Sequence, residues 1–201
     1  MSASLIISIP EWLDRVCAWP VLIYRLWKYG YTYRRIYIGE GKFTIVDLGD
    51  YYWLNKYNWC LWDNGCNKYA RTILYDAKIG TRTISMHREI IRLGAGLLVD
   101  HRNGDGLDNR RENLRPATRA ENCYNKRKTR TKTSSRFIGV CFDKQTNKWR
   151  AYIRYDGKRI WIGRYDSEIE AAKAHDIEAK KHHGEFARLN FSDTDGHGLK
   201  H

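Results

Sequence analysis

The amino-acid sequence predicts an α+β protein of two small modules, and three observations carry that prediction. Residues 149–155 and 159–165 alternate in polarity around an Asp156-Gly157 turn, and a helix signal follows. Residues 41–86 also alternate and are rich in Trp and Tyr. Residues 125–135 contain no apolar side chain, which is typical of a solvated linker. A chain of 201 residues is long enough for two small domains.

The chain is strongly basic, with 36 Lys and Arg against 23 Asp and Glu and a net charge of +13. Residues 123–164 hold thirteen basic and two acidic residues, so nearly all of the excess lies there. This charge favours nucleic acid or an anionic membrane surface as partner over a small acidic substrate. A basic linker would follow phosphates and make binding depend on salt. The alternative for the linker is a solvated segment without a specific partner.

Several classes of protein are not expected. No apolar run approaches the roughly 18–20 residues of a membrane-spanning helix. No basic segment precedes the short apolar run at the N-terminus, so we expect no secretory signal. The five cysteines are odd in number and form no C-x-x-C pair, which disfavours a zinc ribbon and a disulfide framework. Reduced thiols in a cytoplasm fit this pattern best.

The first module begins with an extension, residues 1–36, in which aromatic and basic side chains interleave. We expect a helical extension packed on the rest of the module, because burial accounts for most aromatic clusters. The alternative is an additional contact with DNA or a membrane surface. The β-rich part that follows predicts a short helix or turn over residues 47–57 and strands over residues 43–46, 69–74 and 83–86.

Residues 97–125 are the most informative part of the chain. An apolar strand over residues 97–99 ends in Asp100 and His101, and the Asn-Gly-Asp-Gly of residues 103–106 is a dense turn signal. The T-x-x-E of residues 118–121 is a capping box that begins a helix. Strand, loop, strand and helix would bring together Asp100, His101, Asn113 and Asn122.

These four residue types suit metal-assisted hydrolysis of a phosphodiester. Mg²⁺ accepts hard oxygen ligands such as the Asp100 carboxylate and the Asn122 amide, and keeps positions for water and phosphate. Mn²⁺ is the alternative cation. The metal would stabilise charge on the phosphate and the leaving oxygen. His101 would accept a proton from the attacking water near pH 7, and Asn113 would hold the imidazole or its loop.

The run D-H-x-N-G-D-G-x-D-N-R-x-x-N-L-R-x-A-T-x-x-E-N over residues 100–122 resembles the HNH nuclease superfamily. The Met-His-Arg of residues 86–88 is similar to that of the subfamily found in homing and phage-type enzymes. The resemblance implies a ββα-metal core, with metal bound by Asp100 and Asn122, His101 as general base and Asn113 as the middle Asn of the motif. It leaves His87 either catalytic or supporting, and it gives Asn109 the role of holding the loop.

The second module, residues 136–191, predicts a three-stranded antiparallel sheet packed on one helix. Strands are expected over residues 137–143, 149–155 and 159–165. Ser167 and Glu170 form a capping box for a helix over residues 169–183, and Gly184 is its C-cap. The other face of the sheet carries Arg and aromatic side chains, which monomers seldom display without a partner. Such a sheet can enter the major groove of DNA.

Five motifs in this module resemble the APETALA2/ethylene-response-factor DNA-binding domain. They are G-V (139–140), K-W-x-A-x-I (148–153), R-I-W-I-G-x-Y-D (159–166), E-A-A-x-A-x-D (170–176) and L-N-F (189–191). The resemblance implies that the sheet contacts the major groove through Arg150, Tyr152, Arg154, Arg159, Trp161 and Arg164. Plant members carry Arg on the first strand, where this chain has Ile138 and Cys141. The alternative is a sheet whose Arg side chains bind only phosphates.

The sequence therefore predicts a metal-dependent endonuclease of double-stranded DNA, whose C-terminal sheet selects the site. We expect a homing or phage-type enzyme that is cytoplasmic, bacterial or phage-encoded, and not bound to a membrane. Lys126, Arg127, Lys128 and Arg130 would contact phosphates. The alternatives are a non-catalytic DNA-binding regulator that retains the nuclease scaffold, and an RNA substrate. The expected segments are an extension (1–36), a nuclease module (37–126), a linker (127–135), a DNA-binding domain (136–191) and a frayed tail (192–201).

Overall fold

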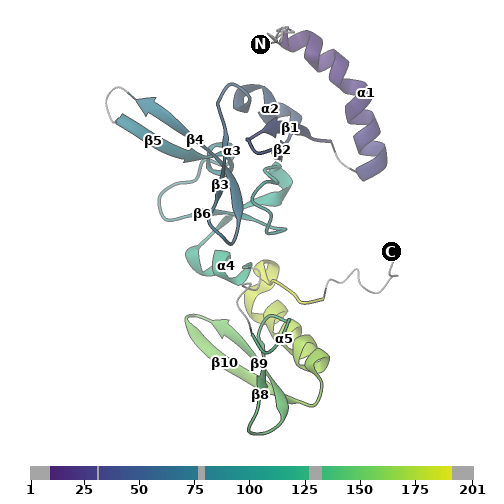
Figure 1. The fold of residues 1–201 in the computed structure, drawn as a ribbon, viewed down its shortest axis with the longest axis vertical. Coiled ribbons are helices and arrows are strands. Elements are labelled where there is room, and N and C mark those ends of the chain that lie inside the picture. The colour runs from purple at the N-terminus through teal and green to yellow at the C-terminus, as the bar shows by residue number, and fades with distance from the viewer. Residues whose placement is uncertain (1–9, 31, 77–79, 127–132, 192–201) are drawn as a thin grey trace. The chain divides into compact units, whose positions relative to one another are not determined.

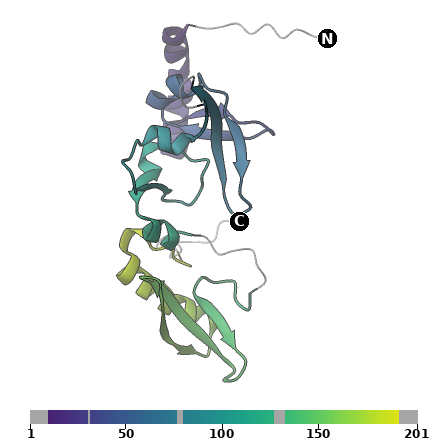
Figure 2. The same cartoon turned by 90° about the vertical axis from the view of Figure 1, so that its left-hand side faces the viewer.

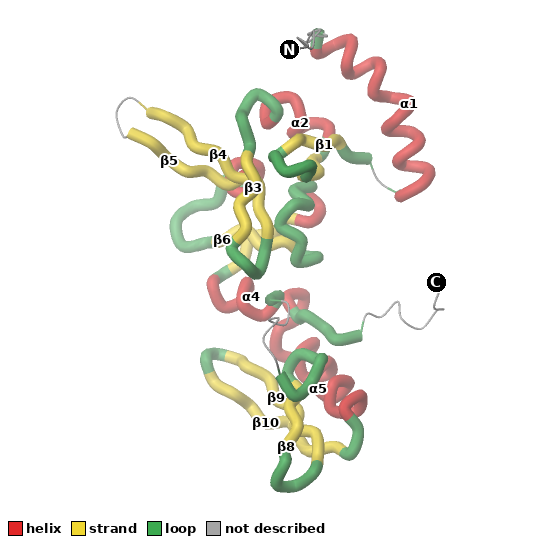
Figure 3. Tube along the Cα trace, viewed as in Figure 1, coloured by secondary structure: helices red, strands yellow, loops and turns green. Residues whose placement is uncertain are grey.

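The computed structural model describes residues 10–30, 32–76, 80–126 and 133–191. It is a mixed α and β structure with several small sheets (Figures 1 and 3), as the sequence predicts. The chain divides into two compact units: Met1–Arg92 with Asp105–Arg115, and Leu93–Gly104 with Pro116–His201. The residues 97–125 singled out above thus contribute to both units. The segment boundaries expected from the sequence stay predictions, and the tail at 192–201 lies outside the described residues.

The first unit contains two small antiparallel sheets (Figure 1). One pairs β1 with β2, and the other has the order β3-β4-β5. The expected strand at 43–46 is confirmed, whereas Met86 begins a helix instead of ending a strand. The elements are α1 (Glu11–Tyr29), β1 (Arg34–Tyr37), β2 (Phe43–Val46), α2 (Leu48–Leu54), β3 (Cys60–Asp63), β4 (Lys68–Asp76), β5 (Gly80–Ser85), α3 (Met86–Ile90) and the 3-10 turn η1 (Arg111–Asn113).

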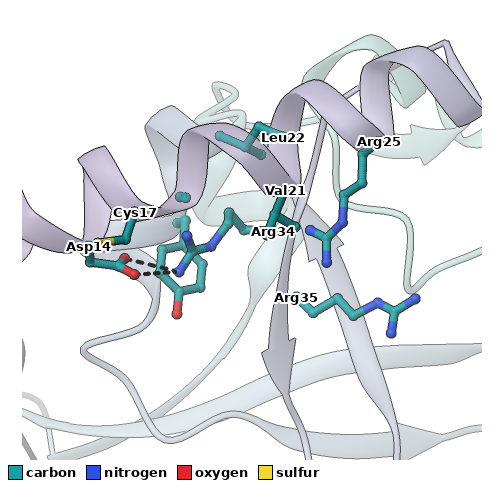
Figure 4. A pocket seen from close by; sticks show the side chains of 9 residues that line it. Asp14, Cys17, Val21, Leu22, Arg25, Arg34 and Arg35 are labelled. Atoms are coloured by element: carbon teal, nitrogen blue, oxygen red, sulfur yellow. Dashed lines mark hydrogen bonds and ion pairs between the residues drawn. The ribbon is translucent and has the colours of Figure 1, made fainter.

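The N-terminal helix α1 packs by one face only. Leu22 is buried there. The Nη2 of Arg34 in β1 donates to the Asp14 carboxylate at 3.0 Å and forms an ion pair with it. Figure 4 shows this pair in a cavity of about 330 Å³ that α1 and β1 line, which contains none of the predicted site residues. Much of the remaining surface of the helix is exposed, with Trp19 at 58% and Trp27 at 81%. The expected helical extension is therefore present but only partly packed.

The second unit contains the remaining elements. They are β6 (Leu98–His101), β7 (Leu114–Ala117), α4 (Arg119–Tyr124), β8 (Val140–Asp143), β9 (Lys148–Tyr155), β10 (Lys158–Tyr165), α5 (Glu168–His183) and the 3-10 turn η2 (Gly184–Phe186). The first two residues of β7 belong to the first unit. Strands β6 and β7 form a two-stranded sheet, and β10-β9-β8 form an antiparallel sheet of three strands.

The sheet of the C-terminal module is covered by α5 on one face (Figure 2), as predicted. Ala171, Ala172 and Ala179 are fully buried, and these small side chains let the helix lie close to the strands. Ser167 caps α5 by accepting the N–H of Ile169 at 3.2 Å, not through the predicted box with Glu170. Strand β8 begins at Val140, later than expected, because the preceding glycine leaves the extended conformation.

The L-N-F end of the module is tied down by a buried carboxylate. Asp176 accepts hydrogen bonds from the backbone N–H groups of Asn190 (2.8 Å) and Phe191 (2.9 Å). The amide of Asn190 in turn exchanges hydrogen bonds with the backbone of Ile138, at 2.6 and 3.1 Å. Burial alone would raise the pKa of Asp176, but the hydrogen bonds from His175 and the two N–H groups outweigh it and hold that pKa below its ordinary value. The carboxylate therefore stays charged and attaches the C-terminal end of the module to α5.

Gly139→Ala is expected to destabilise the C-terminal module by several kcal/mol. Gly139 has φ +70°, and a Cβ there would lie 2.0 Å from Cδ2 of His175 and 2.5 Å from the carbonyl oxygen of Tyr152. The left-handed conformation costs roughly 1–2 kcal/mol and overpacking typically 1–3 kcal/mol more. Hydrogen exchange of peptides from β9 and α5 measures the effect. Gly157→Ala is the control, because it has the same φ and open space for its Cβ. It should lower stability only by the cost of the left-handed backbone conformation. Equal effects of the two changes would contradict this account.

Candidate functional site

The end of strand β6 presents two buried polar side chains, Asp100 and His101, each 5% exposed. Burial of a carboxylate is costly unless it is hydrogen-bonded or binds a cation. Asp100 meets part of this need through an amide: the Nδ2 of Asn125 lies 3.1 and 3.0 Å from its two carboxylate oxygens. The strand end is therefore a place where the fold holds a carboxyl group in a defined orientation.

Helix α4 places Asn122 in its first turn, as expected. The Thr118 hydroxyl accepts the N–H of Glu121 at 3.3 Å, and the Glu121 carboxylate accepts the N–H of Thr118 at 2.7 Å. The predicted capping box is thus confirmed. Helix α4 packs against β6, and Asn122 is half-buried. Asp100, His101 and Asn122 therefore belong to one unit, carried by a strand and a helix in contact.

Asn125 contacts two of the candidate site residues and was not predicted from the sequence. It is 6% exposed and forms the C-cap of α4. Besides the two contacts with Asp100, its Nδ2 donates to the backbone carbonyl of His101 at 2.7 Å. The signal was present in the sequence, because Asn125 lies three residues after Asn122 and so on the same helix face. One amide thus fixes both the carboxylate of Asp100 and the backbone of His101.

Asn113 and Asn109 lie in the first unit, where they shape the loop after the Asn-Gly-Asp-Gly turn. Asn109 is fully buried, and its Nδ2 donates to the Thr44 hydroxyl at 2.7 Å. Its backbone N–H donates to the carbonyl of Ile45 at 2.9 Å. Asn113 is buried, and its Nδ2 donates to the carbonyl of Asp108 at 2.7 Å. Both amides therefore hold the loop, which is the role that the sequence suggested for Asn109.

His87 lies on α3 in the first unit and is 9% exposed. Its ring centroid is 5.4 Å from that of Tyr69. This buried aromatic contact is what a supporting histidine would show. The catalytic alternative for His87 stays a prediction.

The exposed face of the sheet β8–β10 gathers the six side chains predicted to contact DNA. Arg159 lies opposite Arg154, Trp161 opposite Tyr152, and Arg164 opposite Arg150. A bulge between Trp161 and Gly163 shifts the register, and this returns Arg164 to the side of Arg150. The guanidinium of Arg159 lies 4.5 Å from the ring centroid of Tyr152, and Trp161 is 54% exposed. Cationic and aromatic groups therefore alternate across one open face.

Asp143 holds two of these arginines at the end of β8. It is ion-paired with Arg150, and the Nε of Arg164 lies 3.7 Å from the same carboxylate. The hydrogen bond from the Thr146 hydroxyl, followed by the Gln145 N–H and Arg150, lowers the pKa of Asp143 below its ordinary value despite burial. The carboxylate is charged at neutral pH, so it orients Arg150 along the sheet before any ligand binds.

The structure describes one of the four basic residues predicted to contact phosphates from the linker region. Lys126 is exposed, whereas Arg127, Lys128 and Arg130 lie outside the described residues. Within the described part of the chain, no group of three or more His, Cys, Asp or Glu side chains is placed to hold a metal ion. A metal site formed by one carboxylate and one amide would not be such a group, because it contains only one of these side chains. None of the described helices is both long and apolar enough to cross a membrane.

Two family models match the chain. Residues 92–124 match the HNH endonuclease model, and this segment contains Asp100, His101, Asn113 and Asn122. Residues 135–185 match the AP2 domain model, and this segment contains the sheet β8–β10 and α5. The chain thus combines an HNH region with an AP2-like domain.

The similar proteins are of two kinds, a viral HNH endonuclease and plant proteins that match part of the chain. An uncharacterized HNH endonuclease of Acanthamoeba polyphaga mimivirus is 27% identical over 158 residues, which cover 76% of each chain. APETALA2-like protein 2 of Oryza sativa subsp. indica is 37% identical over 62 residues, covering 31% of this chain and 14% of the rice protein. Dehydration-responsive element-binding protein 2A of Arabidopsis thaliana is 46% identical over 50 residues, 24% of this chain and 15% of that protein. The similarity to the plant proteins is therefore confined to one domain. No solved structure matches the chain significantly.

Proposed function

We propose that this chain, in which an HNH region precedes an AP2-like domain, is a metal-dependent endonuclease of double-stranded DNA whose C-terminal sheet selects the site. One observation carries the proposal. The buried Asp100 and His101 end a strand that packs against the helix of Asn122, within the segment that matches the HNH endonuclease model. The similarity to the viral HNH endonuclease over most of both chains supports a nuclease, and we propose that it is of homing or phage type.

The donor set of the second unit fits a hard divalent cation. Asp100 offers a buried carboxylate and Asn122 an amide carbonyl, and oxygen donors of this kind suit Mg²⁺ or Mn²⁺. A carboxylate has about four lone-pair sites, so the contacts with Asn125 leave it capacity for a cation. When bound, such a cation stabilises negative charge on the phosphate and the leaving oxygen.

The residues of the chain itself supply the general base and hold the reacting groups in position. The imidazole of His101 accepts a proton from the attacking water, which free imidazole does readily near pH 7. Asn125 holds the backbone of His101 and the carboxylate of Asp100 in place, so both groups meet the substrate without rearranging. Asn113 fixes the loop that leads into β7.

The C-terminal sheet would bind the duplex. Arg150, Arg159 and Arg164 can donate to phosphates or to guanine edges in the major groove. The sheet is open on the face that carries them, and Asp143 orients two of them. The match of residues 135–185 to the AP2 domain supports DNA as the ligand of this face.

A plasmid assay tests the proposal. Purified chain and supercoiled plasmid carrying a randomised insert are incubated with Mg²⁺, with Mn²⁺, and with excess chelator. We expect nicked or linear product with a cation and none with chelator. Product in the presence of chelator would remove the metal from the mechanism. Binding without product under every condition would favour the non-catalytic regulator instead.

Asn125→Asp is expected to weaken metal-dependent cleavage by about 10–100-fold, the usual effect of changing a residue that orients a metal ligand. The new carboxylate cannot donate to Asp100 and places a like charge beside it. The measurement is cleavage rate against Mg²⁺ concentration, and we expect the half-maximal concentration to rise while DNA affinity stays unchanged. Asn64→Asp is the control: this residue accepts N–H groups in an exposed turn, which an aspartate also does. An unchanged metal dependence in Asn125→Asp would contradict the assigned role.

A further inference from the structure

We infer that a docking contact holds the C-terminal module against the strand and helix that carry the cutting residues, so that cleavage falls at a fixed distance from the bound sequence. The docking contact consists of three pairs within the second unit: Tyr124 with His183, Arg102 with Glu185, and Asn103 with Arg188. This inference rests on the proposed function and deepens it, because it concerns where the enzyme cuts.

The centre of the docking contact is a stack of two rings. The rings of Tyr124 on α4 and His183 on α5 are parallel within 4°, with centroids 3.9 Å apart. The Nε2 of His183 lies 2.8 Å from the carbonyl oxygen of Arg154, which fixes the orientation of the imidazole. The hydroxyl of Tyr124 accepts the backbone N–H of Asp156 at 3.4 Å. The tyrosine is therefore held both by α5 and by the turn between β9 and β10.

Two polar pairs flank the stack. The Nη1 of Arg102 lies 2.8 Å from the Glu185 carboxylate, and the Nη1 of Arg188 donates to the carbonyl of Asn103 at 3.0 Å. The ion pair is exposed and contributes little by itself. Together with the stack, however, these pairs attach the module at two separate places, after β6 and at the end of α4. Two attachments resist rotation, which a single one would permit.

The nuclease side of the docking contact lies directly beside the proposed cutting residues. Arg102 and Asn103 follow His101 in the chain, and Tyr124 stands between Asn122 and Asn125. No flexible connection therefore separates the docked residues from the metal and base positions. The sheet that binds DNA and the residues that cut it would move as one body.

Chain geometry gives the size of the effect. Six residues, 127–132, join Lys126 to Thr133. Fully extended, this connection spans at most about 25 Å, which is about seven base pairs at roughly 3.4 Å each. A module tethered only by the linker would thus allow cuts over several base pairs, and a docked module would not.

A cavity lies beside the docking contact, within the second unit. Its volume is about 760 Å³, and no Asp or Glu is among the residues that line it. Basic side chains line it from both sides, Arg119 and Lys126 from the nuclease part and Arg154 and Arg188 from the C-terminal module. Basic side chains therefore lie on both sides of the docking contact.

The test compares cut positions with the bound sequence. Full-length chain with His183→Ala and Glu185→Gln loses the stack and the ion pair. We expect its DNA affinity to equal that of the wild type, because neither residue belongs to the DNA-binding face, and its cuts to spread over as many as about seven base pairs. End sequencing and footprinting on one duplex give both readouts. His183→Phe, which keeps a ring over Tyr124, should restore the narrow distribution. His182→Ala is the matched control, because this neighbouring histidine contacts Tyr155 and Glu178 of its own module.

A single cut position in the His183→Ala, Glu185→Gln variant would overturn the inference, as would scattered cuts by the wild type. A wild type that does not cut at all contradicts the proposed function, and a second measurement then decides on the docking contact. In the free chain, Tyr124→Ala should increase hydrogen exchange in the peptide of residues 183–188. Unchanged exchange in that peptide would overturn the docking contact regardless of cleavage.

Discussion

His101→Ala is expected to lower the rate of DNA cleavage by about 10²–10⁴-fold, the usual contribution of a positioned general base. The same variant should bind DNA as tightly as the wild type. The basic charge lies mainly in residues 123–164, whereas His101 is buried at the end of β6. The measurements are single-turnover cleavage and equilibrium binding to the same duplex.

His101→Asn provides the matched comparison, because it keeps a polar group of similar size that cannot act as a base near pH 7. It should be as inactive as the alanine variant and should bind DNA normally. His87→Ala gives the contrast: a supporting histidine should cost stability more than it costs the cleavage step. Parallel loss of binding and cleavage in His101→Ala would contradict the division of labour between the two modules.

Arg159→Ala is expected to weaken DNA binding by about 1–3 kcal/mol, or roughly 5–150-fold, if the guanidinium contacts a base edge. Arg159 lies on the open face of the sheet, beside Tyr152 and Trp161. Cleavage at saturating DNA should change little, since the residue is remote in sequence from the cutting residues. Lys173→Ala removes one charge from an exposed position of α5, on the other side of the sheet, and should have little effect.

The salt dependence of the Arg159→Ala variant separates two modes of binding. Loss of a base contact relaxes the choice of sequence at one position and leaves the salt dependence almost unchanged. Loss of a phosphate contact weakens binding to all sequences alike and reduces the slope of log K against log salt by about 1. The second result would support the alternative in which the sheet grips DNA without selecting the sequence.

The local features of this fold were predictable because they rest on neighbouring residues. The capping box of Thr118 and Glu121 and the alternation of residues 149–155 both match the structure. Contacts between distant residues were not predictable. Nothing in the sequence indicates that Asn109 donates to Thr44, 65 positions away. The bulge after Trp161 also breaks the alternation of the strand. A strict two-residue period would therefore place Arg164 on the wrong face of the sheet.

The candidate site was predictable as a set of residues but not as an arrangement. Spacing and resemblance singled out Asp100, His101 and Asn122, and the structure carries them on β6 and α4 of one unit. The spacing does not reveal that one amide, Asn125, holds Asp100 and the backbone of His101 together. It also does not reveal the stack of Tyr124 on His183, which depends on how two separately encoded modules meet.

Cleavage of a randomised duplex library with Mg²⁺, followed by sequencing of the ends, tests whether the HNH region cuts DNA at a site that the C-terminal sheet selects. We expect ends that depend on the cation and on His101, that share a sequence, and that lie at a constant distance from it. Ends without any shared sequence would contradict site selection by the sheet. A library that stays intact with both cations, although the chain binds it, would contradict the nuclease itself.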